Sequence, residues 1–314
     1  MISLLSVLPR VIAAALFAGV LSGTWDAWWH GALGRESFWS PPHMFLYASI
    51  LVAIACGLYG WRKNRDKLWR NLALLLVLVP ASAPFDEFWH RMFGVENVST
   101  PLIIWSPPHL MLVGAILGSF LMLLPILRRD EDPVARRLFG AMSFAGILTL
   151  LFFLASPLEP TGPHRILGFW GAAVTGFFLA ATFLSSQRWM DSVGGAVLTA
   201  AFFILLQAVG FGERISSRVV ITPHEHPPSW IVVFSLLVPA ALIDTARRLP
   251  WWVRGGGVGF LWGTILYGFT SSFFEPQFQY PLSDALTAIV ATTIAGLAAG
   301  IVFSSREKNA QVSV

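Results

Sequence analysis

The sequence predicts an all-α protein: a polytopic membrane helical bundle of about ten transmembrane helices, each needing roughly 20 apolar residues. Its 314 residues are 55% hydrophobic and only 12% charged, with a mean hydropathy of +0.67. Soluble domains carry about twice that share of charge. The basic residues lie in short clusters between apolar stretches, so they indicate membrane topology and argue against a nucleic-acid partner. The bilayer itself is the expected partner.

The spans follow one another with short connections. In chain order we expect them at residues 11–29, 42–60, 70–89, 107–127, 138–156, 166–186, 194–213, 229–246, 255–274 and 284–304. Sixteen of the 21 Lys and Arg residues fall at one end of these spans, whereas ten of the 17 acidic residues fall at the other. The positive-inside rule then places both termini in the cytoplasm and predicts a multi-pass protein of the inner (cytoplasmic) membrane. All seven histidines lie on the non-cytoplasmic side in this topology.

The first four spans contain an internal repeat. One hairpin carries D-A-W-W-H at 26–30 and W-S-P-P-H at 39–43, and the next carries D-E-F-W-H at 86–90 and W-S-P-P-H at 105–109. Both copies begin in the cytoplasm, which makes this a parallel duplication. We therefore expect residues 1–137 to form duplicated metal-binding hairpins of four helices. Residues 138–314 would add six helices to the same membrane domain.

The spacing within each copy favours a metal site. Residues four apart share one face of a helix, so Asp26 and His30 can reach one ion. Ser40 is a candidate N-cap, and the two prolines after it suit a first helical turn, which sets His43 facing back across the hairpin. The same reasoning groups Asp86, His90 and His109.

Structural explanations compete with this interpretation. The same side chains would serve as helix caps, as partners of Arg35 or Arg91, or as anchors at the membrane interface. Each of these explanations suffices for a single residue, but two copies with identical D-x-x-x-H and S-P-P-H spacing favour metal binding. Weaker ligand candidates on the same side are His164 and the His224, Glu225 and His226 segment, for which surface loops are the alternative.

The first copy also resembles a known motif. Asp26-x3-His30-x12-His43, with Trp before the first His and Ser-Pro-x-His at the second, is similar to the copper-ligand motif in the C subunit of particulate methane and ammonia monooxygenases. The resemblance covers residues 20–50 well and 80–114 loosely. It implies copper bound by Asp26, His30 and His43, in enzymes that use O2 to hydroxylate alkanes or ammonia. That family has a second three-ligand site that begins with Asn, where this chain has Asp86, and a periplasmic cupredoxin partner.

The chemistry of the ligands leaves the metal open. Two imidazoles and a carboxylate suit copper, zinc or non-haem iron, and the resemblance favours copper. Three protein ligands would leave a coordination position open for a small molecule. We therefore expect a membrane metalloprotein, either a component of a copper-dependent monooxygenase-like enzyme with other membrane or cupredoxin-type subunits, or a copper transporter or assembly factor. A zinc-dependent membrane hydrolase is the third alternative.

Overall fold

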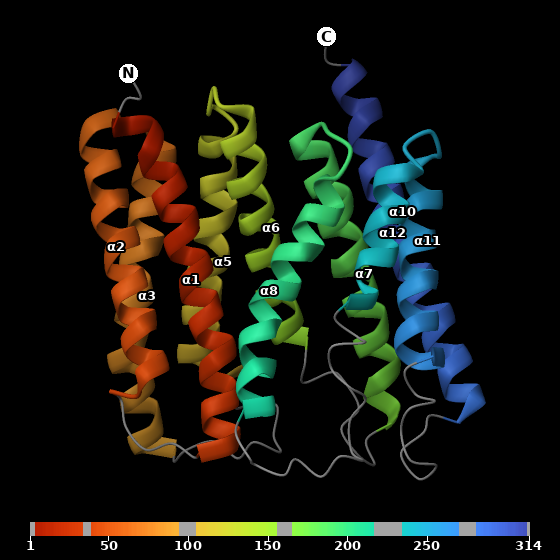
Figure 1. Cartoon of the computed structure of the whole chain (residues 1–314), viewed down its shortest axis with the longest axis horizontal. Coiled ribbons are helices and arrows are strands. Elements are labelled where there is room, and N and C mark those ends of the chain that lie inside the picture. Colours follow the sequence, from red (N-terminus) through yellow and green to blue (C-terminus); the bar gives the residue numbers. More distant parts are fainter. Residues whose placement is uncertain are drawn as a thin grey trace. The chain divides into compact units, whose positions relative to one another are not determined.

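A computed structural model of the protein describes residues 4–33, 39–93, 105–155, 165–216, 234–269 and 281–312. Within these ranges the regular structure is entirely helical, as the sequence predicts (Figure 1). The α-helices are α1 (Leu4–Leu33), α2 (Pro41–Asn64), α3 (Lys67–Phe93), α5 (Pro107–Leu127), α6 (Pro133–Ala155), α7 (Arg165–Met190), α8 (Gly195–Ser216), α10 (Leu237–Thr245), α11 (Trp251–Gly263) and α12 (Leu282–Val312). A π-helical turn, η2 (Thr264–Phe269), continues α11.

Six of the described helices are long and apolar enough to cross a bilayer. They are the Ser6–Asp26 part of α1, the whole of α2, α3, α5 and α6, and the Leu282–Ser305 part of α12. The chain is thus a helical protein with the features of a multi-pass membrane protein. The total of ten spans and the cytoplasmic placement of the termini stay predictions.

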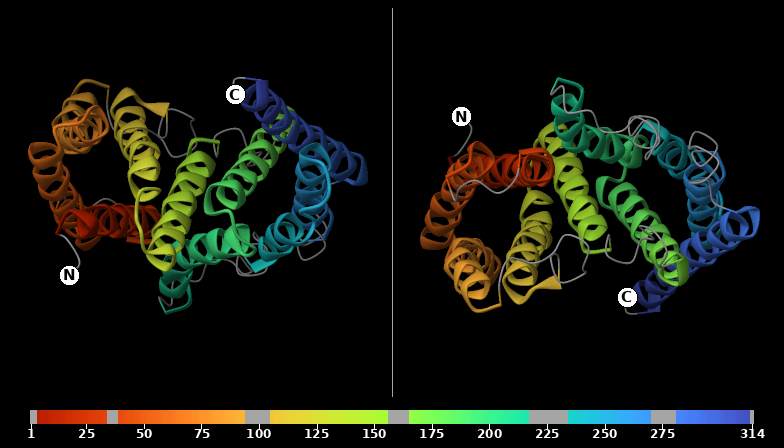
Figure 2. Two further views of the ribbon diagram at one scale, coloured as in Figure 1. Left: turned by 90° about the horizontal axis from the view of Figure 1, so that it is seen from above. Right: turned by 90° about the horizontal axis from the view of Figure 1, so that it is seen from below.

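The chain divides into two compact units, Met1–Leu154 and Ala155–Val314. The division falls at the end of α6. This helix packs closely on α5, since Gly146 of α6 lies against the ring of Phe120 in α5, with no room for a side chain at the glycine. In the first unit α1 contacts α2, α2 contacts α3, α3 contacts α5, and α5 returns to α1, an order that can be followed in Figure 2.

An ion pair joins the first helix of the first unit to the turn between α5 and α6. The Arg10 guanidinium in α1 donates two hydrogen bonds of 2.7 Å to the carboxylate of Asp130, which follows α5. Asp130 is almost fully buried, with its side chain 3% exposed. The contact with Arg10 holds the pKa of the Asp130 carboxyl below its usual range. Because both groups are fixed by two parallel hydrogen bonds, this pair is of the strong, geometrically specific kind.

The turn between α2 and α3 is held by a glycine, an indole and a carboxylate. Trp69 is 3% exposed and its ring fills the space beside Gly60, where any side chain would collide with it. Asp66 caps α3, since its Oδ1 accepts the backbone N–H of Trp69 at 2.8 Å. Arg65 ends α2 in the left-handed region, with φ 58°. These contacts fix the turn in one conformation.

The second unit is packed through small residues. Gly255, Gly259 and Gly263 of α11 recur every four residues and face Gly296 and Gly300 of α12 and the backbone of its Thr292. A Cβ added at any of these glycines would run into the partner helix. Such small-xxx-small seams let the backbones of membrane helices come together, where van der Waals contact replaces the hydrophobic drive that lipid does not provide.

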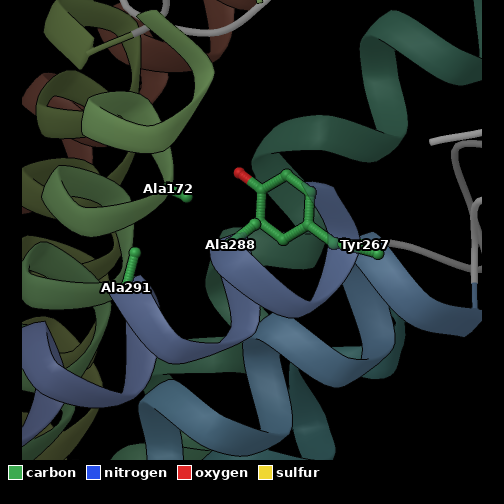
Figure 3. Packing of buried hydrophobic residues seen from close by; sticks show 5 residues of the cluster. Ala172, Tyr267, Ala288 and Ala291 are labelled. Carbon is green, nitrogen blue, oxygen red and sulfur yellow. The ribbon is translucent and has the colours of Figure 1, made fainter. Parts of the chain in front are cut away.

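The π-helical turn closes the far end of this seam. Figure 3 shows the ring of Tyr267, from η2, over Ala288 of α12, with its hydroxyl end towards Ala172 of α7. Tyr267 is 4% exposed, and Ala285 and Ala291 complete the cluster. One large aromatic thus fills the space left by four alanines on two helices.

A buried polar group joins α7, α10 and α11 at the other end of the second unit. Arg254 is 4% exposed; it bonds to Gln187 Oε1 at 2.5 Å and lies over the ring of Trp251 at 3.8 Å. Gln187 Nε2 donates to the Ile243 carbonyl at 2.6 Å. The neighbouring Asp244 caps α8 by accepting the backbone N–H groups of Ala196 and Val197. These contacts satisfy buried polar atoms, as helices packed in lipid require.

Candidate metal centre

The two W-S-P-P-H segments begin their helices in the same way. Ser40 is the N-cap of α2 with φ −58° and ψ 151°, and Ser106 is the N-cap of α5 with φ −62° and ψ 147°. In each, the serine carbonyl accepts the first helical hydrogen bond, at 3.0 Å from Met44 and 2.9 Å from Leu110. Neither serine hydroxyl caps its helix. Two prolines then occupy the first turn, so the histidine follows at a fixed position.

The first cluster brings Asp26 of α1 to His43 of α2 across the hairpin. His43 Nε2 lies 3.1 Å from Asp26 Oδ1, and the side chains are 15% and 23% exposed. That oxygen itself is shielded from solvent. On its other side the His43 ring stacks on Tyr47, with centroids 6.1 Å apart. The hairpin is also tied next to the histidine, since the Ser22 hydroxyl donates to the Pro42 carbonyl.

The second cluster gathers three of the predicted ligands. His90 Nε2 is 3.3 Å from Asp86 Oδ1, four residues earlier on α3, and His109 Nε2 of α5 is 3.6 Å from the same oxygen. The two imidazole rings lie edge to face, with centroids 6.4 Å apart. His90 is 9% exposed, whereas Asp86 and His109 are about one quarter exposed, at 24% and 27%. The carboxylate oxygen thus lies beside both imidazoles.

A hydroxyl that sequence reasoning did not assign to the site orients one of these histidines. Ser106 Oγ is 2.9 Å from His109 Nδ1, so the serine that begins α5 holds the ring by the nitrogen that faces away from Asp86. Ser40 does not do the same in the first hairpin: its hydroxyl is buried and finds no hydrogen-bond partner among the described residues. The S-x-x-H spacing brings the hydroxyl within reach of the ring, but because both hairpins share it, it does not by itself identify Ser106.

The remaining predicted ligands are less well defined. His30 lies in the last turn of α1, four residues after Asp26, but its side chain is outside what the structure describes. His164, His224, Glu225 and His226 lie outside the described residues altogether. The structure therefore brings three of the six main candidates together, Asp86, His90 and His109, and places two more, Asp26 and His43, next to each other.

The contacts of the residues beside the second cluster bear on the structural alternative, in which Asp86 would pair with Arg91. Arg91 was one candidate partner for Asp86, but it bonds to Glu87 Oε1 at 2.9 Å on the exposed side of α3. Trp105, next to Ser106, donates its indole N–H to the Leu154 carbonyl at 2.9 Å. Arg91 and Trp105 are thus engaged elsewhere. Asp86 faces the two histidines.

The distances can be set against those of metal sites. For bonds of about 2.0 to 2.2 Å in a tetrahedral site, donor atoms are about 3.3 to 3.6 Å apart. The three carboxylate–imidazole distances of 3.1, 3.3 and 3.6 Å span that range. The two shorter distances also suit an imidazole N–H that donates to a carboxylate, whereas 3.6 Å is longer than a hydrogen bond. Within the described ranges, no three His, Cys, Asp or Glu side chains are arranged around a common ion position. The donor atoms are therefore close to one another but do not form a complete coordination site.

Comparison with known proteins adds no relative. No protein family model matches the chain, and neither does any curated protein or solved structure. The similarity to the copper-ligand motif consequently rests on the spacing of Asp26, His30 and His43.

Proposed function

We propose that this protein is a membrane metalloprotein that binds copper at two sites, each at the end of one helical hairpin. Asp26, His30 and His43 would hold one ion, and Asp86, His90 and His109 the other. The observation that carries the proposal is the convergence of Asp86, His90 and His109 from two helices, with two Nε2 atoms within 3.6 Å of one shielded carboxylate oxygen.

The donor chemistry supports this assignment. A carboxylate and neutral imidazoles are ligands that copper accepts. Asp86 and Asp26 each have one carboxylate oxygen shielded from solvent. A bound cation would compensate the negative charge of each carboxylate.

The hydroxyl of Ser106 gives the second site a feature typical of metal centres. Histidine ligands usually donate their other ring N–H to a fixed acceptor, which sets the tautomer and the ring orientation. If His109 Nδ1–H donates to Ser106 Oγ, Nε2 carries the lone pair and is free for a metal. In the alternative tautomer the serine donates to Nδ1, and Nε2–H points towards Asp86 instead. A proton on Nδ1 of His109 is therefore compatible with a metal site, whereas a proton on Nε2 would indicate a purely structural contact.

The activity we propose is that of an oxygen-dependent hydroxylase component. Bound copper would supply the redox chemistry with O2, while the protein residues would fix its position and leave a coordination site open. The clusters lie at the ends of apolar helices, and the neighbouring Phe88 and Met92 are exposed, so an apolar substrate can approach through lipid. Further subunits, including one of the cupredoxin type, would complete the enzyme.

The test is metal stoichiometry. The full chain, purified in mild detergent and loaded with copper, is compared with Asp26→Asn, His43→Ala, Asp86→Asn and His109→Ala by elemental analysis and EPR. Wild type should hold two copper ions per chain and each variant about one. Glu87→Gln is the matched control, because Glu87 adjoins Asp86 but pairs with Arg91. A wild-type protein that retains no copper would refute the proposal, and zinc retained in its place would favour the hydrolase.

Transport is the second candidate, favoured by the exposed methionines Met44 and Met92 beside the two clusters. Copper uptake into proteoliposomes separates it from catalysis. Inward flux that is lost in Asp26→Asn would identify a transporter. O2 consumption that requires copper, a reductant and an apolar substrate would identify the hydroxylase.

A further inference from the structure

The opposite end of the α2–α3 hairpin carries a basic hollow that the metal sites do not involve. It has a volume of about 210 Å³ and is lined by Trp61, Arg62 and Arg65. Residues 61–70 contain five Lys or Arg residues and a single acid, Asp66. Both oxygens of that acid have other contacts: Oδ1 caps α3 and Oδ2 accepts from Arg129 at 3.3 Å. The hollow is therefore strongly positive.

The two arginines are held together by the turn itself. Arg65, in the left-handed conformation, bonds through its backbone N–H to the Trp61 carbonyl at 2.9 Å and through Nε to the Arg62 carbonyl at 3.2 Å. Two guanidinium groups that line one hollow repel each other, and an anion between them reverses the sign of that interaction. The backbone of the turn that carries them is already fixed by the contact of Trp69 with Gly60.

An apolar track leads to this hollow along α2. Leu51, Ala55 and Leu58 are exposed and precede Arg62 at helical spacing, so all four lie on one face of the helix. Leu51 and Leu58 are 63% and 41% exposed. Since α2 and α3 are both long and apolar enough to cross a bilayer, their shared turn lies at the level of lipid headgroups, where tryptophan also prefers to be. The face thus offers an acyl chain an apolar path that ends at paired cations.

We infer that this face binds an anionic phospholipid, with the phosphate between Arg62 and Arg65 and an acyl chain along Leu51, Ala55 and Leu58. Clusters of basic residues next to a transmembrane helix attract anionic lipids by about 1 kcal/mol per residue, or roughly fivefold in affinity. A free phosphate ion would use the arginines but gain nothing from the apolar track. The chemistry therefore points to a lipid as the occupant.

Native mass spectrometry of the full chain in neutral detergent tests this inference, with phosphatidylglycerol, phosphatidylcholine and glycerol phosphate as probes. Phosphatidylglycerol should bind tightest, and Arg62→Gln/Arg65→Asn should weaken it by about twentyfold. Asn suits the left-handed position of residue 65. Arg62→Lys/Arg65→Lys should restore most of the affinity. The control Arg247→Gln/Arg248→Gln removes two exposed arginines from the turn before α11 and should bind as wild type.

Several results would overturn the inference. They are an equal loss of affinity in the control variant, no loss in Arg62→Gln/Arg65→Asn, or binding of glycerol phosphate as tight as that of phosphatidylglycerol. The wild-type protein gives an independent test, because added salt should weaken the binding of phosphatidylglycerol and leave that of phosphatidylcholine unchanged. An affinity for phosphatidylglycerol that is insensitive to salt would contradict the assigned role of the arginines.

Discussion

The α1/α2 and α3/α5 hairpins share one sequence pattern but differ in how firmly they hold its side chains in place. In the α3/α5 hairpin, Asp86 faces both His90 and His109, and Ser106 fixes the latter from behind. In the α1/α2 hairpin, Asp26 faces His43. The His43 ring stacks on the ring of Tyr47, whereas His109 is held by a serine hydroxyl. A repeated motif thus sets which residues meet, while the surrounding contacts set how rigidly they meet.

This difference predicts unequal metal sites. A ligand held by a hydrogen bond loses less freedom on binding than one held by ring stacking, so the second site should load first. The following changes test the comparison, from the largest expected effect to the smallest.

Removing a carboxylate should abolish one site and leave the other. Asp86→Ala should eliminate the tighter copper site, and Asp26→Ala the weaker one, each with a loss greater than the roughly 10- to 100-fold that an outer-shell change costs. Isothermal titration of each variant with copper measures this. If either single variant loses both ions, the two hairpins form one site and the comparison is wrong.

Breaking the contact between Arg10 and Asp130 should destabilise both hairpins together. Arg10 belongs to the first hairpin and Asp130 follows the second, so Asp130→Ala should cost about 3 kcal/mol in the free energy of unfolding. Thermal unfolding in detergent reports it, and the exposed neighbour Glu131 gives the control Glu131→Ala, expected to change little.

The same contact predicts an acid dependence. The pKa of Asp130 is lowered in the folded protein, chiefly by its hydrogen bonds to Arg10. Its stabilisation is therefore complete above the unfolded carboxyl pKa of about 3.9 and is lost as the pH falls through the lower, folded value. The melting temperature of wild type should drop in this acidic window, and that of Asp130→Ala should drop less. Equal acid sensitivity in both proteins would rule out this origin.

The two cap serines should respond differently to the same substitution. Ser106→Ala should weaken copper binding at the second site by about 10- to 100-fold, because His109 loses its hydrogen-bond partner. Ser40→Ala should leave the first site unchanged, since the Ser40 hydroxyl contacts no described hydrogen-bond partner. Equal effects at both sites would contradict the difference between the hairpins.

The smallest effect is expected at Tyr47. Ring contacts contribute about 0.5 to 1.5 kcal/mol, so Tyr47→Leu should lower copper affinity at the first site by roughly threefold. Leu110→Ala serves as a control on α5, at an exposed position one residue after His109. Titration with copper at the first site, measured in an Asp86→Ala background, isolates the change.

Much of the fold and part of the site followed from the sequence. Apolar length located the helices, because the bilayer thickness sets a minimum span, and the S-P-P-H pattern located the starts of α2 and α5. The i,i+4 spacing placed Asp86 next to His90, and the hairpin geometry placed Asp26 opposite His43. These features are local or separated by one short connection.

Contacts between segments far apart in the chain could not be predicted from the sequence. Nothing in the sequence pairs Arg10 with Asp130, 120 residues away, over the other carboxylates near the same end of the helices. The glycine seam between α11 and α12 and the position of Tyr267 depend on which helices become neighbours. Orientation of His109 by Ser106 depends on rotamers that repeat spacing does not determine.

The Arg10–Asp130 pair also sets a time order for making the protein. Arg10 leaves the ribosome 120 residues before its partner, an interval of about 6 to 24 s at ordinary rates of synthesis. During that time α1, α2, α3 and α5 have all been made, yet the contact that joins the first of them to the last cannot exist. The ion pair that closes the four helices of the two hairpins therefore forms only after the short turn following α5 has emerged.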